Sequence, residues 1–218
     1  MILILVGESA SGKSTLAKQF EKDNPNFSRI VTYTTRPKRE GEIDTVDYHF
    51  INALAFDNMI KQGCFVEHAS YRGWQYGTAI NFGKDDDKIV VLTPAGARAF
   101  RRYAEAHPEL NLDILVVYLN VDRRSRLIKM LQRGDDIEEC TRRSLSDVGQ
   151  FDSFENEADF TINNEKYINS VEDLSWYLGV IIKTYKEGRL TIEDVIKAMK
   201  EYEDTSEQIM SKGVQGEE

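Results

Sequence analysis

The 218-residue sequence has only two cysteines, three histidines and four prolines. Cys64 and Cys140 match neither the spacing of a metal-ligand set nor that of a redox motif. Their scarcity excludes a disulfide-built fold and predicts two reduced thiols in a cytoplasmic protein. Long apolar runs are also missing, because no segment approaches the roughly 20 residues of a membrane-spanning helix. The first residues lack the basic stretch and cleavage site of a signal peptide, so we expect no membrane partner.

Basic residues are in deficit, with 28 Lys and Arg against 37 Asp and Glu and a formal charge of −9. This balance argues against nonspecific nucleic-acid binding, which relies on many contacts between basic side chains and phosphates. A hydrophobic content of 41% with 30% charged residues is typical of a globular protein with one core and insertions. The basic residues gather at 36–39 and 123–143, where we expect anionic substrates to bind.

The most specific motif lies at residues 7–14, which read Gly-Glu-Ser-Ala-Ser-Gly-Lys-Ser directly after the apolar run 2–6. A Gly-x-x-x-x-Gly-Lys-Ser loop between a strand and a helix predicts nucleoside triphosphate binding, because its backbone N–H groups surround phosphate oxygens. Lys13 is predicted to reach the β- and γ-phosphates, and Ser14 to ligate Mg²⁺. The predicted ATP-binding residues of this loop are Gly7, Glu8, Ser9, Ala10, Ser11, Gly12, Lys13, Ser14 and Thr15.

The apolar pattern predicts an α/β fold, a P-loop NTPase three-layer sandwich around a mainly parallel sheet. Expected strands cover residues 2–6, 89–92, 112–119 and 160–162, and expected helices cover 14–22, 94–107, 123–132, 137–154, 171–186 and 191–202. The core domain would comprise residues 1–31 and 87–218. An aromatic-rich insertion, residues 32–86, would form a small mixed or antiparallel subdomain with a helix at 54–62. The polar tail, 205–218, is expected to be disordered.

The insertion carries a second motif, in which Thr-Thr-Arg-Pro-Lys-Arg ends at Arg39 and Asp-Tyr-His-Phe follows at 47–50. Arg36 and Arg39 flank a proline and can present two guanidinium forks to one phosphate. Tyr48 and Tyr76 can add neutral hydrogen-bond donors, although aromatic filling of a small core is an equally good interpretation of both.

These motifs resemble the guanylate kinase family over about residues 1–165. The resemblance implies a kinase that transfers phosphate from Mg-ATP to GMP, acting as a monomer or homodimer. It places Arg36, Arg39, Tyr48 and Tyr76 at the GMP phosphate. The remaining implied GMP contacts are Thr32, Glu67, Gly77, Thr78 and Thr93.

Glu67 also supports a guanine ligand on chemical grounds. An ionised carboxylate only accepts hydrogen bonds, and guanine offers two adjacent donors, its ring N–H and its exocyclic amine. Adenine would place a ring acceptor against one carboxylate oxygen, and such an unpaired contact discriminates strongly between ligands. A solvent-exposed surface glutamate is the alternative interpretation.

A helical lid is expected at residues 123–146. By the family resemblance, Arg133 in Arg-Gly-Asp-Asp and a later arginine, Arg143, join Lys13, Arg36 and Arg39 as catalytic residues. Arg133 and Asn164 are also expected to contact ATP. Two departures from the family pattern stand out. Ser144 occupies the position of the usual lid arginine, and Val91 and Thr93 occupy the positions of two carboxylates in Leu-Asp-x-Asp-x-x-Gly. The second departure leaves three alternatives open, namely weaker metal handling, altered base choice, or replacement by a residue elsewhere.

Three functions remain open on the sequence. The first is phosphoryl transfer from Mg-ATP to GMP. The second is transfer to another acceptor, namely a different nucleotide, a deoxynucleotide or a ribose bisphosphate, which the missing carboxylates favour. The third is a non-catalytic guanylate-kinase-like binding module, against which the complete Gly12-Lys13-Ser14 element argues.

Overall fold

The computed structural model describes residues 1–71, 73–79, 87–163 and 170–200. The chain divides into two compact units, Met1–Glu165 and Lys166–Glu218. The strands of the first unit are β1 (Ile2–Val6), β2 (Phe27–Arg29), β3 (Tyr33–Thr34), β4 (His49–Phe50), β5 (Phe65–Tyr71), β6 (Trp74–Ala79), β7 (Asp87–Val91), β8 (Ile114–Asn120) and β9 (Phe160–Asn163). Its α-helices are α1 (Lys13–Asp23), α2 (Ala53–Lys61), α3 (Pro94–Ala106), α4 (Arg123–Gln132) and α5 (Ile137–Asp147), with 3₁₀ turns at Pro108–Leu110 and Phe154–Asn156.

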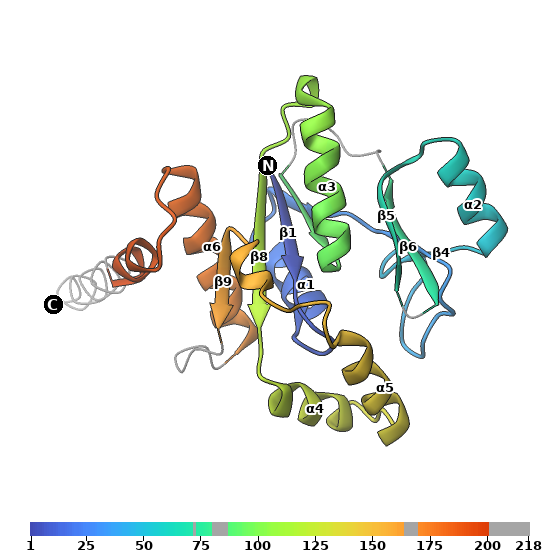
Figure 1. Cartoon of the computed structure of the whole chain (residues 1–218). Coiled ribbons are helices and arrows are strands. Elements are labelled where there is room, and N and C mark those ends of the chain that lie inside the picture. The colour runs from blue at the N-terminus through green and yellow to red at the C-terminus, as the bar shows by residue number, and fades with distance from the viewer. Residues whose placement is uncertain (72, 80–86, 164–169, 201–218) are drawn as a thin grey trace, which may run out of the picture. The chain divides into compact units, whose positions relative to one another are not determined.

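Five parallel strands form the main sheet, in the order β2-β7-β1-β8-β9. Figure 1 labels three of them, β1, β8 and β9. The central strand β1 is buried along its whole length. Side chains of a strand alternate between the two faces of its sheet, so an unbroken apolar run requires cover on both faces. The predicted α/β class and parallel sheet are therefore confirmed. The short edge strand β2 was not predicted.

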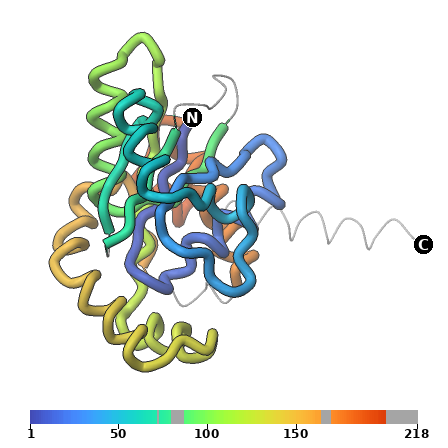
Figure 2. The backbone as a smooth tube through the Cα atoms, turned by 90° about the vertical axis from the view of Figure 1, so that its right-hand side faces the viewer, coloured from blue at the N-terminus to red at the C-terminus, as the bar shows by residue number. Residues whose placement is uncertain are grey.

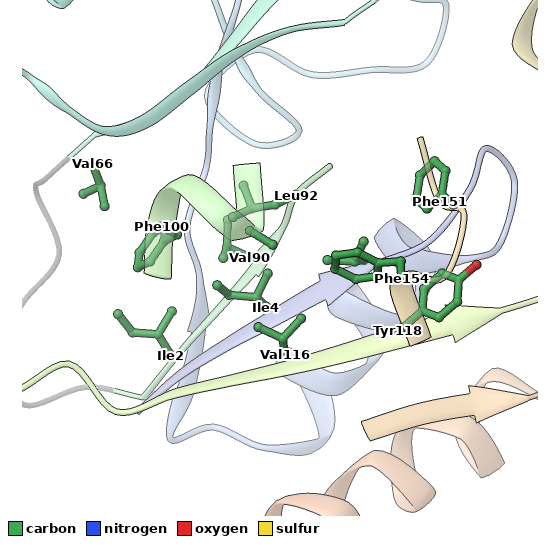
Figure 3. Close-up of a cluster of buried hydrophobic side chains, with 12 residues drawn as sticks. Ile2, Ile4, Val66, Val90, Leu92, Phe100, Val116, Tyr118, Phe151 and Phe154 are labelled. Atoms are coloured by element: carbon green, nitrogen blue, oxygen red, sulfur yellow. The ribbon is translucent and has the colours of Figure 1, made fainter. Parts of the chain in front are cut away.

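One face of the sheet packs on α3 through a cluster of buried side chains (Figure 3). Ile4, Val90 and Val116 from three adjacent strands meet Phe100 of α3 in this cluster. Leu3, Leu5 and their neighbours point to the opposite face, where α1 contacts β1, β2 and β7. Val66 of β5 belongs to the same cluster and ties the second sheet to α3. The core thus fixes the position of β5 relative to the carboxyl end of β1.

The insertion forms a four-stranded sheet in the order β4-β3-β6-β5. β3 pairs parallel to β4 and antiparallel to β6, so the sheet is mixed, as predicted. Gly77 of β6 is buried where the Phe65 and Phe56 rings approach the backbone, and a Cβ atom at this position would lie 2.9 Å from the Phe65 ring. Only a glycine fits this contact without movement of the two rings.

The prediction of one helix over residues 137–154 is wrong. α5 ends at Asp147, because the next residue, Val148, is extended (ψ 130°) and Gly149 is left-handed (φ 77°). This turn returns the chain to the sheet, where Phe151 and Phe154 join the buried cluster. The strand predicted from residue 112 begins at Ile114. α4 and α5 lie beyond the carboxyl ends of β1 and β8 (Figures 1 and 2).

The second unit contains α6 (Val171–Lys186), which begins with a capping box between Ser170 and Asp173. A further helical stretch covers residues 192–200, and its predicted N-cap, Thr191, accepts the N–H of Asp194 at 3.1 Å. The expectations for Asn164 and for the tail 205–218 fall outside the described residues. Among the residues that are described, no helix has the length and apolar character needed to cross a bilayer.

We predict that Gly77→Ala lowers the free energy of unfolding by about 1–3 kcal/mol, because the new methyl group overpacks the contact with Phe65 and Phe56. Urea denaturation would measure the change. Gly179→Ala is the matched control, since its Cβ atom meets nothing within 4 Å. Alanine within a helix should instead stabilise the chain by roughly 0.5–1 kcal/mol. Equal effects of the two substitutions would contradict the packing argument.

Candidate functional site

A cavity of about 460 Å³ lies at the carboxyl ends of β1 and β7, between the phosphate loop, the insertion and the α4–α5 segment. Most of the predicted site residues line it. Those from the loop are Gly7, Ser9, Ala10, Gly12, Lys13, Ser14 and Thr15. Those from the insertion, from the end of β7 and from the lid segment are Thr32, Arg36, Arg39, Tyr48, Glu67, Tyr76, Thr93, Arg133 and Arg143.

The phosphate loop has the backbone that its sequence predicts. A Cβ atom on Gly7 would lie 2.8 Å from the carbonyl oxygen of Leu119 in β8, so only glycine allows this close approach. Ala10 and Gly12 both have positive φ angles, 62° and 97°. Alternating left-handed residues allow successive N–H groups to converge on one anion. Ala10 carries a side chain in this rarely adopted conformation, a form of strain that is common at ligand sites.

The start of α1 completes the anion-binding end of the loop. The helix begins at Lys13 after the left-handed Gly12, so its N-terminus faces the cavity. The Lys13 ammonium donates to the Glu8 carbonyl oxygen at 2.7 Å and to the Ser11 hydroxyl at 3.2 Å. This position holds the charge over the loop. Glu8 and Ser11 do not themselves line the cavity, and their predicted contacts with ATP stay a prediction.

The groups around the loop that could ligate a metal suit a magnesium ion that binds together with a phosphate ligand. The described residues contain no group of three or more His, Cys, Asp or Glu side chains placed to hold a metal. Val91 and Thr93, which line the cavity near Ser14, supply no carboxylate. Mg²⁺ commonly keeps several water ligands and binds substrate phosphates. The Ser14 hydroxyl therefore fits as one protein ligand of such an ion.

Arg36 is held in place before any ligand binds. Its Nη1 and Nη2 atoms donate to the Glu42 carboxylate at 2.9 and 2.7 Å, and Nη1 also donates to the Pro37 carbonyl oxygen at 2.8 Å. The guanidinium carbon lies 5.3 Å from the centre of the Tyr48 ring. These contacts occupy one fork of a side chain that is only 7% exposed. These contacts leave the second fork, Nε with the outer Nη2 hydrogen, unused, and the Arg36 side chain lines the cavity.

Positive charges converge on this part of the cavity. Loss of hydration lowers the pKa of Arg39, and the neighbouring charges of Arg36 and Arg143 lower it further. Arg143 is buried and pairs with Glu139 and, at 3.0 Å, with Asp135. The structure thus places Arg143, rather than the following Ser144, at the cavity. Arg133 lines the cavity as well and pairs with Asp135.

Glu67 is buried, with an exposed fraction of 4%. The Thr78 hydroxyl donates to its Oε1 at 2.6 Å, and this contact and the Thr78 backbone both act to lower the pKa of the carboxyl. Burial nevertheless dominates and raises the pKa of the Glu67 carboxyl to about 7. The alternative of an exposed surface glutamate is therefore wrong. Thr78 lies behind Glu67 and does not itself line the cavity, and neither does Gly77.

The N-terminus of α3 faces the Glu67 carboxylate. Thr93 caps this helix by accepting the N–H of Gly96 at 3.1 Å. A Cβ atom on Gly96 would lie 3.0 Å from Glu67 Oε2, so the absence of a side chain there leaves room for the carboxylate. The positive end of a helix favours a nearby anion and partly offsets the loss of hydration at Glu67.

Eight residues that the sequence did not single out as ligand contacts also line the cavity. They are Ala69, Tyr71, Trp74, Val91, Leu92, Lys129, Arg142 and Phe151. The strand period offered one signal, because Ala69 and Tyr71 share a strand face with Glu67. Phe151 had none, since it reaches the cavity only through the turn that ends α5.

The family model and the curated relatives that match this chain agree on one family. The family model described as guanylate kinase matches residues 1–181. A guanylate kinase of Nostoc sp. is 33% identical over 171 residues, covering 76% of this chain and 83% of the relative. One from Symbiobacterium thermophilum is 27% identical over 203 residues, covering 90% and 93%. The crystal structure of a guanylate kinase from Anaplasma phagocytophilum superposes with a TM-score of 0.62 at 20% identity, covers 85% of each chain, and shows the same fold.

We predict that Glu67→Gln stabilises the protein above neutral pH. The pKa of the carboxyl is about 7 in the folded chain and 4.5 when it is freely solvated. Below pH 4.5 the group is protonated in both states and costs nothing. As the pH rises through 7 the folded protein must hold a buried anion, and the gap between the two pKa values costs about 3 kcal/mol.

Urea unfolding at pH 8 and pH 5.5 would measure this difference. The advantage of Glu67→Gln should be about 3 kcal/mol at pH 8 and clearly smaller at pH 5.5. The exposed Glu105→Gln on α3 is the control and should show no such pH dependence. A Glu67→Gln protein no more stable than the natural protein at pH 8 would refute the burial cost.

Proposed function

We propose that this chain, which belongs to the guanylate kinase family and is a phosphotransferase, moves the γ-phosphoryl group of Mg-ATP onto the α-phosphate of GMP. The observation that carries the proposal is the buried Glu67 carboxylate at the wall of a cavity that also contains the phosphate loop. A carboxylate in that position accepts the two adjacent N–H donors of guanine.

ATP would bind at the phosphate loop. Its β- and γ-phosphates would meet the backbone N–H groups of the loop, the N-terminus of α1 and the Lys13 ammonium. The Ser14 hydroxyl would hold a Mg²⁺ ion that arrives with the triphosphate, and such an ion would supply neutralising charge to the phosphate oxygens. Arg133 would approach the triphosphate from the lid segment, where it lines the cavity.

The GMP phosphate would lie among the guanidinium groups of the insertion. Arg36 keeps one fork on Glu42 and turns the other toward the cavity, which suits a bidentate contact with phosphate. Arg39, whose pKa is lowered by burial and then by the neighbouring charges of Arg36 and Arg143, would gain from an incoming anion. Tyr48 and Tyr76 line the same wall and supply hydroxyl donors.

Guanine would be recognised by a single carboxylate, Glu67, because Val91 and Thr93 occupy the positions where the family pattern has further carboxylates. Glu67 accepts from the purine edge, and Thr78 holds that carboxylate from behind. Thr32 and Thr93 line the cavity around it and offer hydroxyl groups to the remaining polar atoms of the base. Because Val91 and Thr93 are neutral, Glu67 supplies the anionic selectivity of this pocket.

The chemistry then requires positioning and charge rather than a general base. The acceptor is a phosphate oxygen that is already anionic near neutral pH, so no proton has to be removed before attack. Lys13, Arg36, Arg39, Arg133 and Arg143 would surround the transferring group and stabilise its developing charge. Enclosure by the lid segment and the insertion would exclude water, which otherwise hydrolyses ATP.

The two alternatives have less support. A ribose bisphosphate acceptor carries no base to pair with the buried Glu67 carboxylate. A non-catalytic binding module needs no triphosphate site, yet Gly7, Gly12 and Lys13 keep the geometry that such a site requires. Another purine monophosphate or deoxynucleotide is the competitor that an experiment has to exclude.

The proposal is tested by ADP release with Mg-ATP and a panel of acceptors comprising GMP, dGMP, IMP, AMP and ribose 1,5-bisphosphate. GMP is expected to give the highest kcat/KM. Lys13→Met should reduce turnover by at least about a hundredfold, because it removes the cation over the transferred phosphate. A natural protein that phosphorylates another acceptor much faster than GMP would refute the substrate assignment.

Glu67→Gln is expected to raise KM for GMP by about ten- to a hundredfold, as loss of hydrogen bonds to a charged acceptor costs about 1.5–3 kcal/mol. KM for AMP should change little. The natural protein should also bind GMP about tenfold more tightly at pH 8 than at pH 6, because ionisation of Glu67 follows its pKa of about 7. The glutamine variant experiences the same change in GMP charge, so it isolates the contribution of Glu67. An unchanged ratio of GMP to AMP turnover would contradict the assignment.

A further inference from the structure

A second buried carboxylate, Asp147, lies at the end of α5 and takes no part in the chemistry described above. Its side chain is 3% exposed. It accepts the Ser9 backbone N–H at 2.9 Å and the Ser9 hydroxyl at 3.2 Å, both from the phosphate loop. It also accepts a hydrogen bond from the Tyr71 hydroxyl, at the end of β5 in the insertion. One side chain of the lid segment's second helix thus contacts both substrate-binding segments.

The same carboxylate belongs to a charged network beneath the cavity. Arg126 of α4 lies 3.5 Å from Asp147 and 3.3 Å from Glu8, measured between charged atoms. Glu8 also accepts the Tyr118 hydroxyl at 3.1 Å. The Arg126 Nη1 atom that faces Asp147 is buried and makes no hydrogen bond among the described residues. A small approach of α4 to α5 would therefore shorten the Arg126–Asp147 contact into a charged hydrogen bond.

The position of this network matters for the reaction. Ser9 and Tyr71 line the cavity, whereas Asp147 lies behind them. Tyr71 and Glu67 stand four residues apart on β5, so they share a strand face and move together. Holding Tyr71 against Ser9 therefore fixes the distance between β5, which carries Glu67, and the phosphate loop. That distance would set the separation between the γ-phosphate of ATP and the phosphate of GMP.

We propose that Asp147 is a positioning residue for phosphoryl transfer, which joins the phosphate loop to β5 through the end of the lid segment. This inference rests on the proposed function. Asp147 contacts neither nucleotide. It acts by fixing Ser9 and Tyr71, so that donor and acceptor meet in line. Misplacement of reacting groups by about 1 Å can cost a hundredfold in rate, so loss of this contact should lower kcat more than it changes binding.

The test measures kcat, KM for each nucleotide and thermal stability for five proteins: the natural chain, Asp147→Asn, Tyr71→Phe, the double variant, and Asp152→Asn. Asp152→Asn is the control, because this substitution makes the same chemical change at an exposed position five residues away. Asp147→Asn should lower kcat at least about tenfold and shift each KM less than about threefold. Asp152→Asn should match the natural chain.

Tyr71→Phe removes one hydroxyl group and keeps the aromatic ring. It therefore tests the proposal if the Asp147→Asn variant does not fold. It should lower kcat several-fold, and it should add little in the Asp147→Asn background because both changes weaken the same hydrogen bond between Tyr71 and residue 147. Multiplicative effects of the two changes would overturn the link through Tyr71. An unchanged kcat in Asp147→Asn, with only a lower melting temperature, would overturn the positioning role.

The outcome for the proposed function is separate. If the natural chain phosphorylates another acceptor instead of GMP, the proposed function fails, and the same five proteins are compared with that acceptor. Ser9 and Tyr71, the residues that Asp147 is proposed to position, lie in the loop and at the end of β5, so its expected effect on kcat holds for any acceptor. A natural chain that transfers phosphate to no acceptor refutes both.

Discussion

A buried carboxylate that has lost its water needs hydrogen-bond donors from its surroundings. This requirement at Glu67 shapes the part of the cavity that is proposed to bind the phosphate acceptor. The Thr78 hydroxyl and the open first turn of α3 at Gly96 provide its surroundings. The surroundings are incomplete, since burial still raises the pKa of Glu67 to about 7. A ligand with two adjacent N–H donors supplies what the protein leaves out. Recognition and instability therefore have one origin, in line with the common conflict between activity and stability.

The arginines of the cavity are also charged groups that need partners, but their charge is positive. Several guanidinium groups near one another repel, and the ligand-free protein offsets this repulsion with its own acids. Glu42 holds one fork of Arg36, and Glu139 with Asp135 holds Arg143. These pairs fix the geometry of the cations without filling the cavity. A phosphate bound there, as proposed, would meet side chains that are already oriented, which would reduce the entropic cost of binding.

The three segments of the site are joined by polar contacts behind the cavity wall. Val66 packs β5 on the main core, while Asp147 links the end of α5 to Ser9 and Tyr71. Apolar packing tolerates small sliding movements, whereas a buried carboxylate with several donors has one satisfactory arrangement. The network of Asp147, Arg126 and Glu8 therefore defines how the lid segment meets the loop, more sharply than the exposed apolar side chains of α4 and α5 do.

The sequence by itself determined the parts whose information is local. The Gly-x-x-x-x-Gly-Lys-Ser motif gave the loop and its flanking elements, and unbroken apolar runs gave the parallel strands. Glu67 was implied by the family resemblance, and the hydrogen-bond chemistry of a carboxylate with guanine supported it. Tertiary structure alone decided the rest. The end of α5 at Asp147 depends on where Phe151 and Phe154 enter the core. The orientation of the Arg36 guanidinium depends on its hydrogen bonds to Glu42. Asp147 contacts a residue 138 positions away in the chain, and no local pattern encodes such a distance.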